Sequence, residues 1–189
     1  MIQNIFEYIE YLEGNYIERT AFQYCDKSEK YQVSYRKYID DIKKFAVYLR
    51  EKYEVTEGKH IAVLSRDTYR MAVCINGIIY AKAVAVPLNI EENEQEIISL
   101  IESADVECLF GDPLYKYQEK IGQIVEWNNI YTTDESCKGE DFDKNVDPKL
   151  PCVILFSSGT VGRRKAIMLS QEALFGNMRY SIRQLERDN

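Results

Sequence analysis

The chain has 189 residues, of which 46% are hydrophobic and 29% are charged, and its formal net charge is −7 at pH 7. This is the composition of an ordinary globular domain, and the acidic balance argues against a nucleic-acid-binding protein that uses a broad basic face. No run of about 18 apolar residues is present, and the acidic N-terminus has no basic segment, so we expect neither a membrane span nor a secretory signal.

The thiols and the single histidine do not form the pattern of a metal site or a disulfide framework. The five cysteines are widely spaced and never arranged as CxxC. We therefore expect free thiols, no bound metal and a cytoplasmic, reducing location. His60 stands alone before a strand, which favours a structural role and excludes histidine-based triads. We assign no catalytic residue within the chain.

The first 57 residues predict a helix, a hairpin and a second helix. Apolar residues from Ile2 to Leu12 recur on one stripe of an amphipathic helix. Strands at 20–25 and 30–34 flank a polar turn and predict a hairpin. Ser34 is placed to cap the helix that follows, because its hydroxyl can accept a hydrogen bond from a first-turn amide.

From residue 58 onward the pattern alternates between strands and helices. Strands are predicted at 60–65, 84–88, 106–110, 152–156 and 166–169, with a weak strand near Ile130. The first two helices between them begin at Asp67 or Thr68 and at Asn93, where Glu96 completes a capping box. A short helix at 114–121, an acidic surface loop at 133–149 and a closing helix at 173–189 complete the predicted order.

This alternation predicts an α/β fold, a mostly parallel sheet covered by helices on both faces, with a small N-terminal hairpin. We treat residues 1–189 as one domain. Residues 1–57 carry the N-terminal helix, the hairpin and the first domain helix, and residues 58–189 form the α/β layer. Ligands of such sheets bind beyond the carboxyl ends of the strands, and the loop at 157–165 lies at such an end.

The loop at 157–165 has the chemistry of an anion-binding site. Glycines let backbone amides approach a ligand, hydroxyls donate hydrogen bonds, and a lysine supplies a mobile ammonium. These groups come from Ser157, Ser158, Gly159, Thr160, Gly162 and Lys165. Phosphate is the common guest of such a loop, because charge-assisted hydrogen bonds to its oxygens are strong.

Two common phosphate loops do not match this segment. A Walker A loop has Ser or Thr after its lysine and runs into a helix, whereas Lys165 is followed by Ala166 and a strand. A dinucleotide loop has GxGxxG at the start of a helix, whereas Gly159 and Gly162 lie between strands. The residues alone leave two interpretations open, a phosphate site and a Gly-containing hairpin turn.

Four segments in order resemble the adenylate-forming superfamily, which includes acyl-CoA synthetases, nonribosomal-peptide adenylation domains and luciferases. The loop is similar to the family's phosphate-binding loop. VSYRKY (33–38) resembles its Leu-Thr-Tyr-x-Glu-Leu segment, and IYAKAVAVPLN (79–89) resembles Leu-Lys-Ala-Gly-Ala-x-x-x-Pro-Leu-Asp. GKHIAVL (58–64) resembles the Gly-Asp-x-Val-Ala-Ile strand between them. Their order and spacing match, and together they cover most of residues 20–180.

The resemblance implies activation of a carboxylic acid with ATP and Mg²⁺, release of pyrophosphate and transfer of the acyl group to a thiol of CoA or a carrier protein. The loop is implied to hold the β- and γ-phosphates through the six residues named above. The family's adenosine- and acid-binding segments lie further along its chains. We therefore expect a truncated N-terminal subdomain, inactive by itself, that self-associates through surface exposed by truncation.

Five positions depart from the family pattern. Val161 lacks the usual hydroxyl, and Arg164 stands where the family has proline. Lys82 replaces a glycine and Asn89 an aspartate, and for both we expect a role in packing or on the surface. Gln171 replaces a histidine, which implies a lost role near the acyl site.

Two alternative hypotheses remain. One is a stand-alone, noncatalytic module that binds phosphate, a nucleotide or a partner through the same half-fold. The other is a structural remnant that binds no ligand.

Overall fold

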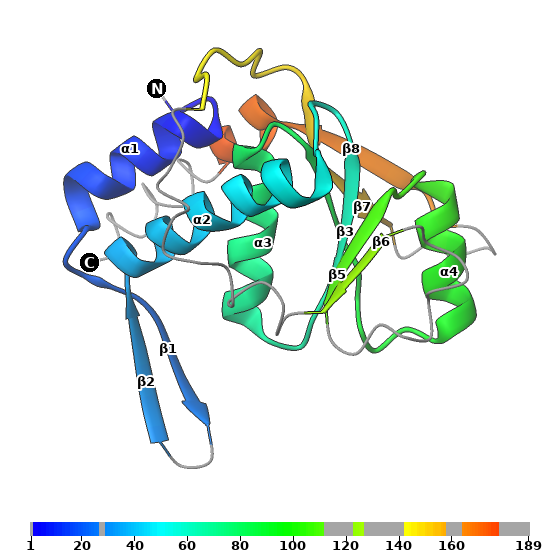
Figure 1. Cartoon of the computed structure of the whole chain (residues 1–189), viewed down its shortest axis with the longest axis horizontal. Helices are drawn as coiled ribbons and strands as arrows, with labels where there is room; N and C mark the ends of the chain where they lie inside the picture. Colours follow the sequence, from blue (N-terminus) through cyan, green and yellow to red (C-terminus); the bar gives the residue numbers. More distant parts are fainter. Residues whose placement is uncertain (1, 27–28, 112–122, 127–141, 158–163, 178–189) are drawn as a thin grey trace.

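The computed structural model describes residues 2–26, 29–111, 123–126, 142–157 and 164–177 (Figure 1). The helices are α1 Ile5–Tyr16, α2 Tyr35–Tyr53, α3 Thr68–Tyr80 and α4 Glu94–Ser103. The strands are β1 Thr20–Asp26, β2 Glu29–Ser34, β3 His60–Leu64, β4 Val84–Pro87, β5 Cys108–Gly111, β6 Gln123–Glu126, β7 Pro151–Phe156 and β8 Ala166–Ser170. Residues 171–177 are also helical. No helix in these ranges is long and apolar enough to span a membrane.

The main sheet has six strands in the order β6-β5-β3-β4-β7-β8. The pairs β3–β4, β3–β5, β5–β6 and β4–β7 are parallel, and β8 returns antiparallel to β7. Strands β1 and β2 form a separate hairpin that extends away from the sheet (Figure 1). The predicted α/β fold with a mostly parallel sheet and a small hairpin is therefore confirmed.

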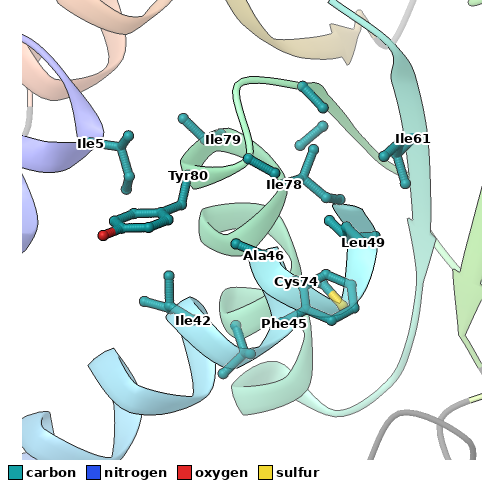
Figure 2. Close-up of a cluster of buried hydrophobic side chains, with 14 of the residues drawn as sticks. Ile5, Ile42, Phe45, Ala46, Leu49, Ile61, Cys74, Ile78, Ile79 and Tyr80 are labelled. Atoms are coloured by element: carbon teal, nitrogen blue, oxygen red, sulfur yellow. The ribbon is translucent and has the colours of Figure 1, made fainter. Parts of the chain in front are cut away.

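Successive residues of each strand enter two cores on opposite faces of the sheet, because side chains alternate along a strand. Ile61 and Val63 belong to the core built with α1, α2 and α3, whereas Ala62 and Leu64 belong to the core built with α4. Figure 2 shows the larger core, where side chains of α1, α2 and α3 meet β3. Helices thus cover both faces, as the sequence predicts.

Local capping signals place most helix starts where they are expected. Ser34 and Asp67 accept hydrogen bonds from the amides of Lys37 and Arg70, which satisfies donors of the first helical turn. Asn93 likewise accepts from the amide of Glu96, at 2.9 Å. The predicted capping box is not seen among the described residues, because the Glu96 carboxylate pairs instead with Arg164, with 3.0 Å between Nε and Oε1.

The connection between β5 and β7 is only partly described. Strand β6 covers residues 123–126, which the sequence analysis did not single out as a strand. The expected strand near Ile130, the expected helix at 114–121 and most of the expected acidic loop lie outside the described residues. In the closing helix, Phe175 is 1% exposed, as its inward position predicts.

Gln171 fastens the N-terminal helix to the end of the main sheet. Its side-chain oxygen accepts a hydrogen bond from the backbone amide of Ile5 at 3.0 Å, and its backbone amide donates to the carbonyl of Leu150. Gln171 follows β8, and the register pairs Ser170 with Pro151 at the amino end of β7. Gln171 therefore lies at the opposite end of the strands from the loop, and it joins the start of α1 to that end of the sheet.

Lys82 occupies a backbone conformation that favours glycine. Its φ is 63°, in the left-handed region, and its carbonyl accepts a hydrogen bond from the amide of Gly58. Contacts of the side chain offset the cost of this backbone conformation, because the Lys82 ammonium lies 3.1 Å from the Asp143 carboxylate and 2.9 Å from the Asn145 carbonyl. The Asn145 amide, and then Lys82, lower the pKa of the Asp143 carboxyl. Lys82 thus anchors the segment that leads into β7.

We predict that Gly77→Ala destabilises the fold, because α2 and α3 approach closely at this glycine. A Cβ at Gly77 would lie 2.6 Å from Cδ1 of Phe45 and 3.1 Å from the carbonyl oxygen of Ile42. Such overpacking costs about 1–3 kcal/mol of unfolding free energy, measurable by urea denaturation. Gly14→Ala in α1 is the control: nothing lies within 4 Å, and we expect a gain of about 0.5–1 kcal/mol. A gain at both positions would contradict the close helix contact.

We predict that Lys82→Gly is more stable than Lys82→Ala by about 1 kcal/mol. Both variants lose the contacts to Asp143 and Asn145. In the alanine variant the backbone at residue 82 stays strained, because the left-handed conformation costs a residue with a Cβ about 1–2 kcal/mol. Glycine has no Cβ and avoids this cost. Chemical denaturation of the two variants measures the difference. Equal stabilities would show that the backbone at residue 82 is not strained.

Candidate functional site

The two arms of the predicted phosphate loop lie at the carboxyl end of β7. Ser157 follows β7 directly, and Lys165 directly precedes β8. Because β3, β4, β5, β6 and β7 run parallel, the loop shares this edge of the sheet with the ends of the neighbouring strands. The structure therefore places the arms where open α/β sheets bind their ligands.

A pair of hydrogen bonds joins the two arms. The backbone amide of Ser157 donates to the carbonyl of Lys165 at 3.0 Å, and the backbone amide of Lys165 donates to the Ser157 hydroxyl at 3.2 Å. A serine hydroxyl has one donor and two acceptor positions, so accepting this bond leaves its O–H available to a ligand. The antiparallel return of β8 thus keeps Ser157 and Lys165 side by side.

The remaining predicted phosphate contacts come from the tip of the loop. Ser158, Gly159, Thr160 and Gly162 lie outside the described residues, as does Val161. Their roles stay predictions from the sequence. The described part of the predicted site therefore consists of Ser157 and Lys165 with the neighbouring Arg164.

Lys165 supplies an ammonium group with no ion pair in the described part of the chain. Its side chain is exposed. Arg164, the adjacent residue, differs in this respect. Its Nη2 lies 2.7 Å from Oε1 of Glu92, and its Nε lies 3.0 Å from Oε1 of Glu96. These contacts, the hydrogen bond to Glu92 first, raise the pKa of the Arg164 guanidinium.

Glu92 lies in the loop after β4 and Glu96 in the first turn of α4, and neither was predicted from the sequence to belong to the site. Asn89 organises this segment, because its side-chain oxygen accepts from the amide of Glu91 and its carbonyl accepts from the amide of Glu92. A carboxylate pair at a helix start is also explained by the helix dipole, so the sequence held no distinct signal for their contact with Arg164.

The loops after β3 and β4 leave the sheet toward opposite faces. The chain continues from β3 into α3, which packs in the larger core, and from β4 into α4, which packs in the smaller one. Such a switch point opens a crevice for ligands in doubly wound sheets. Arg66 and Glu91, from these two loops, approach each other across it at 3.5 Å. Strand β7 is the next strand after β4, so the arms of the loop lie beside this point.

The histidine and the three cysteines whose surroundings the structure describes have structural roles. The Nδ1 of His60 lies 2.6 Å from the carbonyl of Ala104, in keeping with the structural role expected for it. Cys74, Cys108 and Cys152 are buried free thiols. Burial raises the pKa of Cys108 and Cys152 to about 12 and raises that of Cys74 as well. A buried protonated thiol is a poor nucleophile, so these three cysteines serve packing.

Comparisons with known proteins identify the family. The family model described as "AMP-binding enzyme" matches residues 12–189. The 2-succinylbenzoate--CoA ligase of Bacillus cereus (strain AH820) is 23% identical over 164 residues, which cover 82% of this chain and 32% of the ligase. The chain spans between 23% and 32% of the length of the first ligases it matches.

Solved structures agree with this fold. The N-terminal domain of FACL13 from Mycobacterium tuberculosis superposes with a TM-score of 0.77 at 16% identity, over 89% of this chain and 44% of that one. The N-terminal subdomain of Klebsiella oxytoca NpsA, solved with anthranilyl-AMSN, gives a TM-score of 0.75 at 16% identity, over 90% and 42%. The sheet order, the position of the loop and the family match lead to one conclusion: the chain belongs to the AMP-binding enzyme family.

Proposed function

We propose that the chain is the phosphate-binding part of an ATP-dependent carboxylic acid–thiol ligase, and that its loop holds the β- and γ-phosphates of ATP. The observation that carries this proposal is the joined pair of Ser157 and Lys165 at the carboxyl edge of the sheet. Together they offer a hydroxyl donor and an ammonium group without an ion pair among the described residues. Both groups suit the oxygens of a phosphate.

The proposed reaction follows the chemistry that the family shares. A carboxylate oxygen of the acid attacks the α-phosphorus of ATP, and the bond to the β-phosphate breaks to release pyrophosphate. A thiol then displaces AMP from the acyl-adenylate. Ser157 and Lys165 would act on the leaving pyrophosphate, where negative charge accumulates. Ser158, Gly159, Thr160 and Gly162 are proposed to complete this grip.

Magnesium would enter this site with the nucleotide. No group of three or more His, Cys, Asp or Glu residues in the described ranges is arranged to hold a metal ion. The nearby carboxylates of Glu92 and Glu96 already pair with Arg164. Mg²⁺ is commonly held by substrate phosphates and few protein ligands, which suits this arrangement.

We propose that the 189 residues bind phosphates without completing the reaction. They align with less than half of a solved N-terminal subdomain of the same fold. An assay of ATP–pyrophosphate exchange with a panel of acids should therefore show none for this chain. We place the protein in the cytoplasm, where ATP and CoA are available, and the buried free thiols suit that compartment.

We predict that Lys165→Ala weakens the binding of Mg²⁺·pyrophosphate by roughly 10- to 100-fold. The variant removes a charge-assisted hydrogen bond, which contributes about 1.5–3 kcal/mol. Isothermal titration calorimetry on the 189-residue chain measures the change. Lys149→Ala is the matched control, because Lys149 is also exposed and lies before the amino end of β7, at the other edge of the sheet. Its affinity should equal that of the wild type.

Two results would overturn this function. If the wild-type chain shows no heat of binding with pyrophosphate or ATP·Mg²⁺, the loop is a structural turn. If Lys165→Ala and Lys149→Ala weaken binding equally, the effect reflects net charge and not a phosphate site. ATP–pyrophosphate exchange by the chain itself would contradict its lack of turnover and favour an independent enzyme.

We further propose that copies of this chain associate through the exposed apolar end of β7 and β8. Leu155 and Ile167 face each other across the two strands and are 40% and 47% exposed, and Met168 is 57% exposed on the opposite face. Strand β8 is also an outermost strand of the six-stranded sheet. Exposed apolar side chains on an edge strand favour pairing with another chain.

We predict that the average mass of the 189-residue chain in sedimentation equilibrium rises with its concentration. The double variant Ile167→Thr/Met168→Thr should raise the dissociation constant at least about tenfold, because even one apolar side chain contributes about 1.5–3 kcal/mol when it is fully covered. Tyr24→Thr, which removes an aromatic ring of 43% exposure from the hairpin, should leave the association unchanged. A wild-type chain that is monomeric at every concentration would contradict the proposed association.

A further inference from the structure

Arg164 links the phosphate loop to a different part of the sheet edge. Its guanidinium contacts Glu92, in the turn after β4, and Glu96, in the first turn of α4. The contacts use two different nitrogens, Nη2 and Nε, so the planar group is fixed in orientation as well as in distance. Asn89 holds the turn that carries Glu92 through hydrogen bonds to the amides of Glu91 and Glu92.

This ion pair is better shielded from solvent than its neighbour at the same edge. The side chains of Arg164, Glu92 and Glu96 are 29%, 21% and 35% exposed. Those of Arg66 and Glu91 are 76% and 71% exposed, and their charged atoms lie farther apart, at 3.5 Å. Solvent screens an exposed pair more strongly, so the Arg164 contacts hold the backbone more firmly.

The position of Arg164 transmits this restraint to the phosphate-binding groups. Arg164 directly precedes Lys165, whose backbone amide and carbonyl make both hydrogen bonds to Ser157. A fixed Arg164 therefore limits the movement of Lys165. The charge of Arg164 is neutralised by Glu92 and Glu96. Lys165 is therefore the cation on this side of the loop that remains available to a ligand.

We propose that Arg164 is a positioning residue: through Glu92 and Glu96 it holds the arm of the loop so that Lys165 and Ser157 are ready to bind phosphate. The inference rests on the proposed phosphate-binding function. It assigns to a long-range ion pair the rigidity that a proline ring supplies at this position in the family pattern. Binding then costs less ordering of the loop, which increases affinity.

The double variant Glu92→Gln/Glu96→Gln distinguishes positioning from direct binding. If Arg164 itself bound phosphate, freeing its guanidinium and removing two negative charges would tighten the binding of Mg²⁺·pyrophosphate. Positioning instead predicts weaker binding, by about three- to thirtyfold, the range for residues that act through others. Calorimetric titration of the folded 189-residue chain measures the change, and thermal unfolding monitors the integrity of each variant.

Substitutions of Arg164 itself provide a second test. Arg164→Ala should weaken binding as the double variant does. Arg164→Pro should keep affinity within about threefold of the wild type, because proline fixes φ and the amide of Arg164 donates no hydrogen bond among the described residues. Loss of binding in Arg164→Pro equal to that in Arg164→Ala would overturn positioning. Arg36→Ala, which removes an exposed ion pair between Arg36 of α2 and Glu18, is the control and should bind like the wild type.

Hydrogen exchange separates this inference from the proposed function. The amides of Ser157 and Lys165 should exchange faster in Glu92→Gln/Glu96→Gln than in the wild type and in Arg36→Ala, with or without a ligand. Equal exchange rates would overturn positioning, even where pyrophosphate binds. A wild-type chain that binds no pyrophosphate would overturn the phosphate site, while faster exchange in the double variant would still support the restraint by Arg164. Tighter pyrophosphate binding by the double variant would show that Arg164 contacts the ligand directly, and it would overturn the positioning role.

Discussion

The parallel pairing of β4 with β7 is the constraint on which the candidate site depends. It joins a strand from the first half of the chain to the strand that carries the loop, with Ala85 opposite Val153. Because both strands point the same way, the turn after β4 and the loop after β7 emerge at one edge. Arg164 then meets Glu92 and Glu96 without any contact between them being encoded locally. Without this pairing the loop would be an isolated turn at the end of a hairpin.

An acidic chain that binds a polyanion must separate its charges in space. The net charge is −7, yet the carboxylates of the sheet edge are matched by arginines: Glu91 by Arg66, and Glu92 and Glu96 by Arg164. Each of these three carboxylates therefore has a positively charged partner at the same end of the sheet. Lys165, beside them, has no ion pair among the described residues, which suits the phosphate ligand that we propose.

The sequence predicted the features that depend on near neighbours. Hydrophobic spacing located α1 to α4, and Ser34, Asp67 and Asn93 were recognised as caps because capping acts within one helical turn. It did not predict that Glu96 faces Arg164 rather than its own helix start, because that choice depends on how β4 and β7 pair. Lys82 was expected to serve packing or the surface, and only the backbone geometry revealed its left-handed conformation. Strand β6 was missed because four residues carry too little pattern to distinguish a strand.

The bond between Gln171 and Ile5 has a consequence for the order in which the molecule is assembled. During synthesis α1 leaves the ribosome well before the groups that hold its start: Gln171 accepts a hydrogen bond from its first turn, and the ring of Phe175 packs against Tyr8 with centroids 5.4 Å apart. Contacts between such distant parts of a chain form slowly. Helix α1 therefore lacks these contacts until residues 171–175 have been made, and a peptide released before residue 171 would leave its first turn without the bond to Gln171.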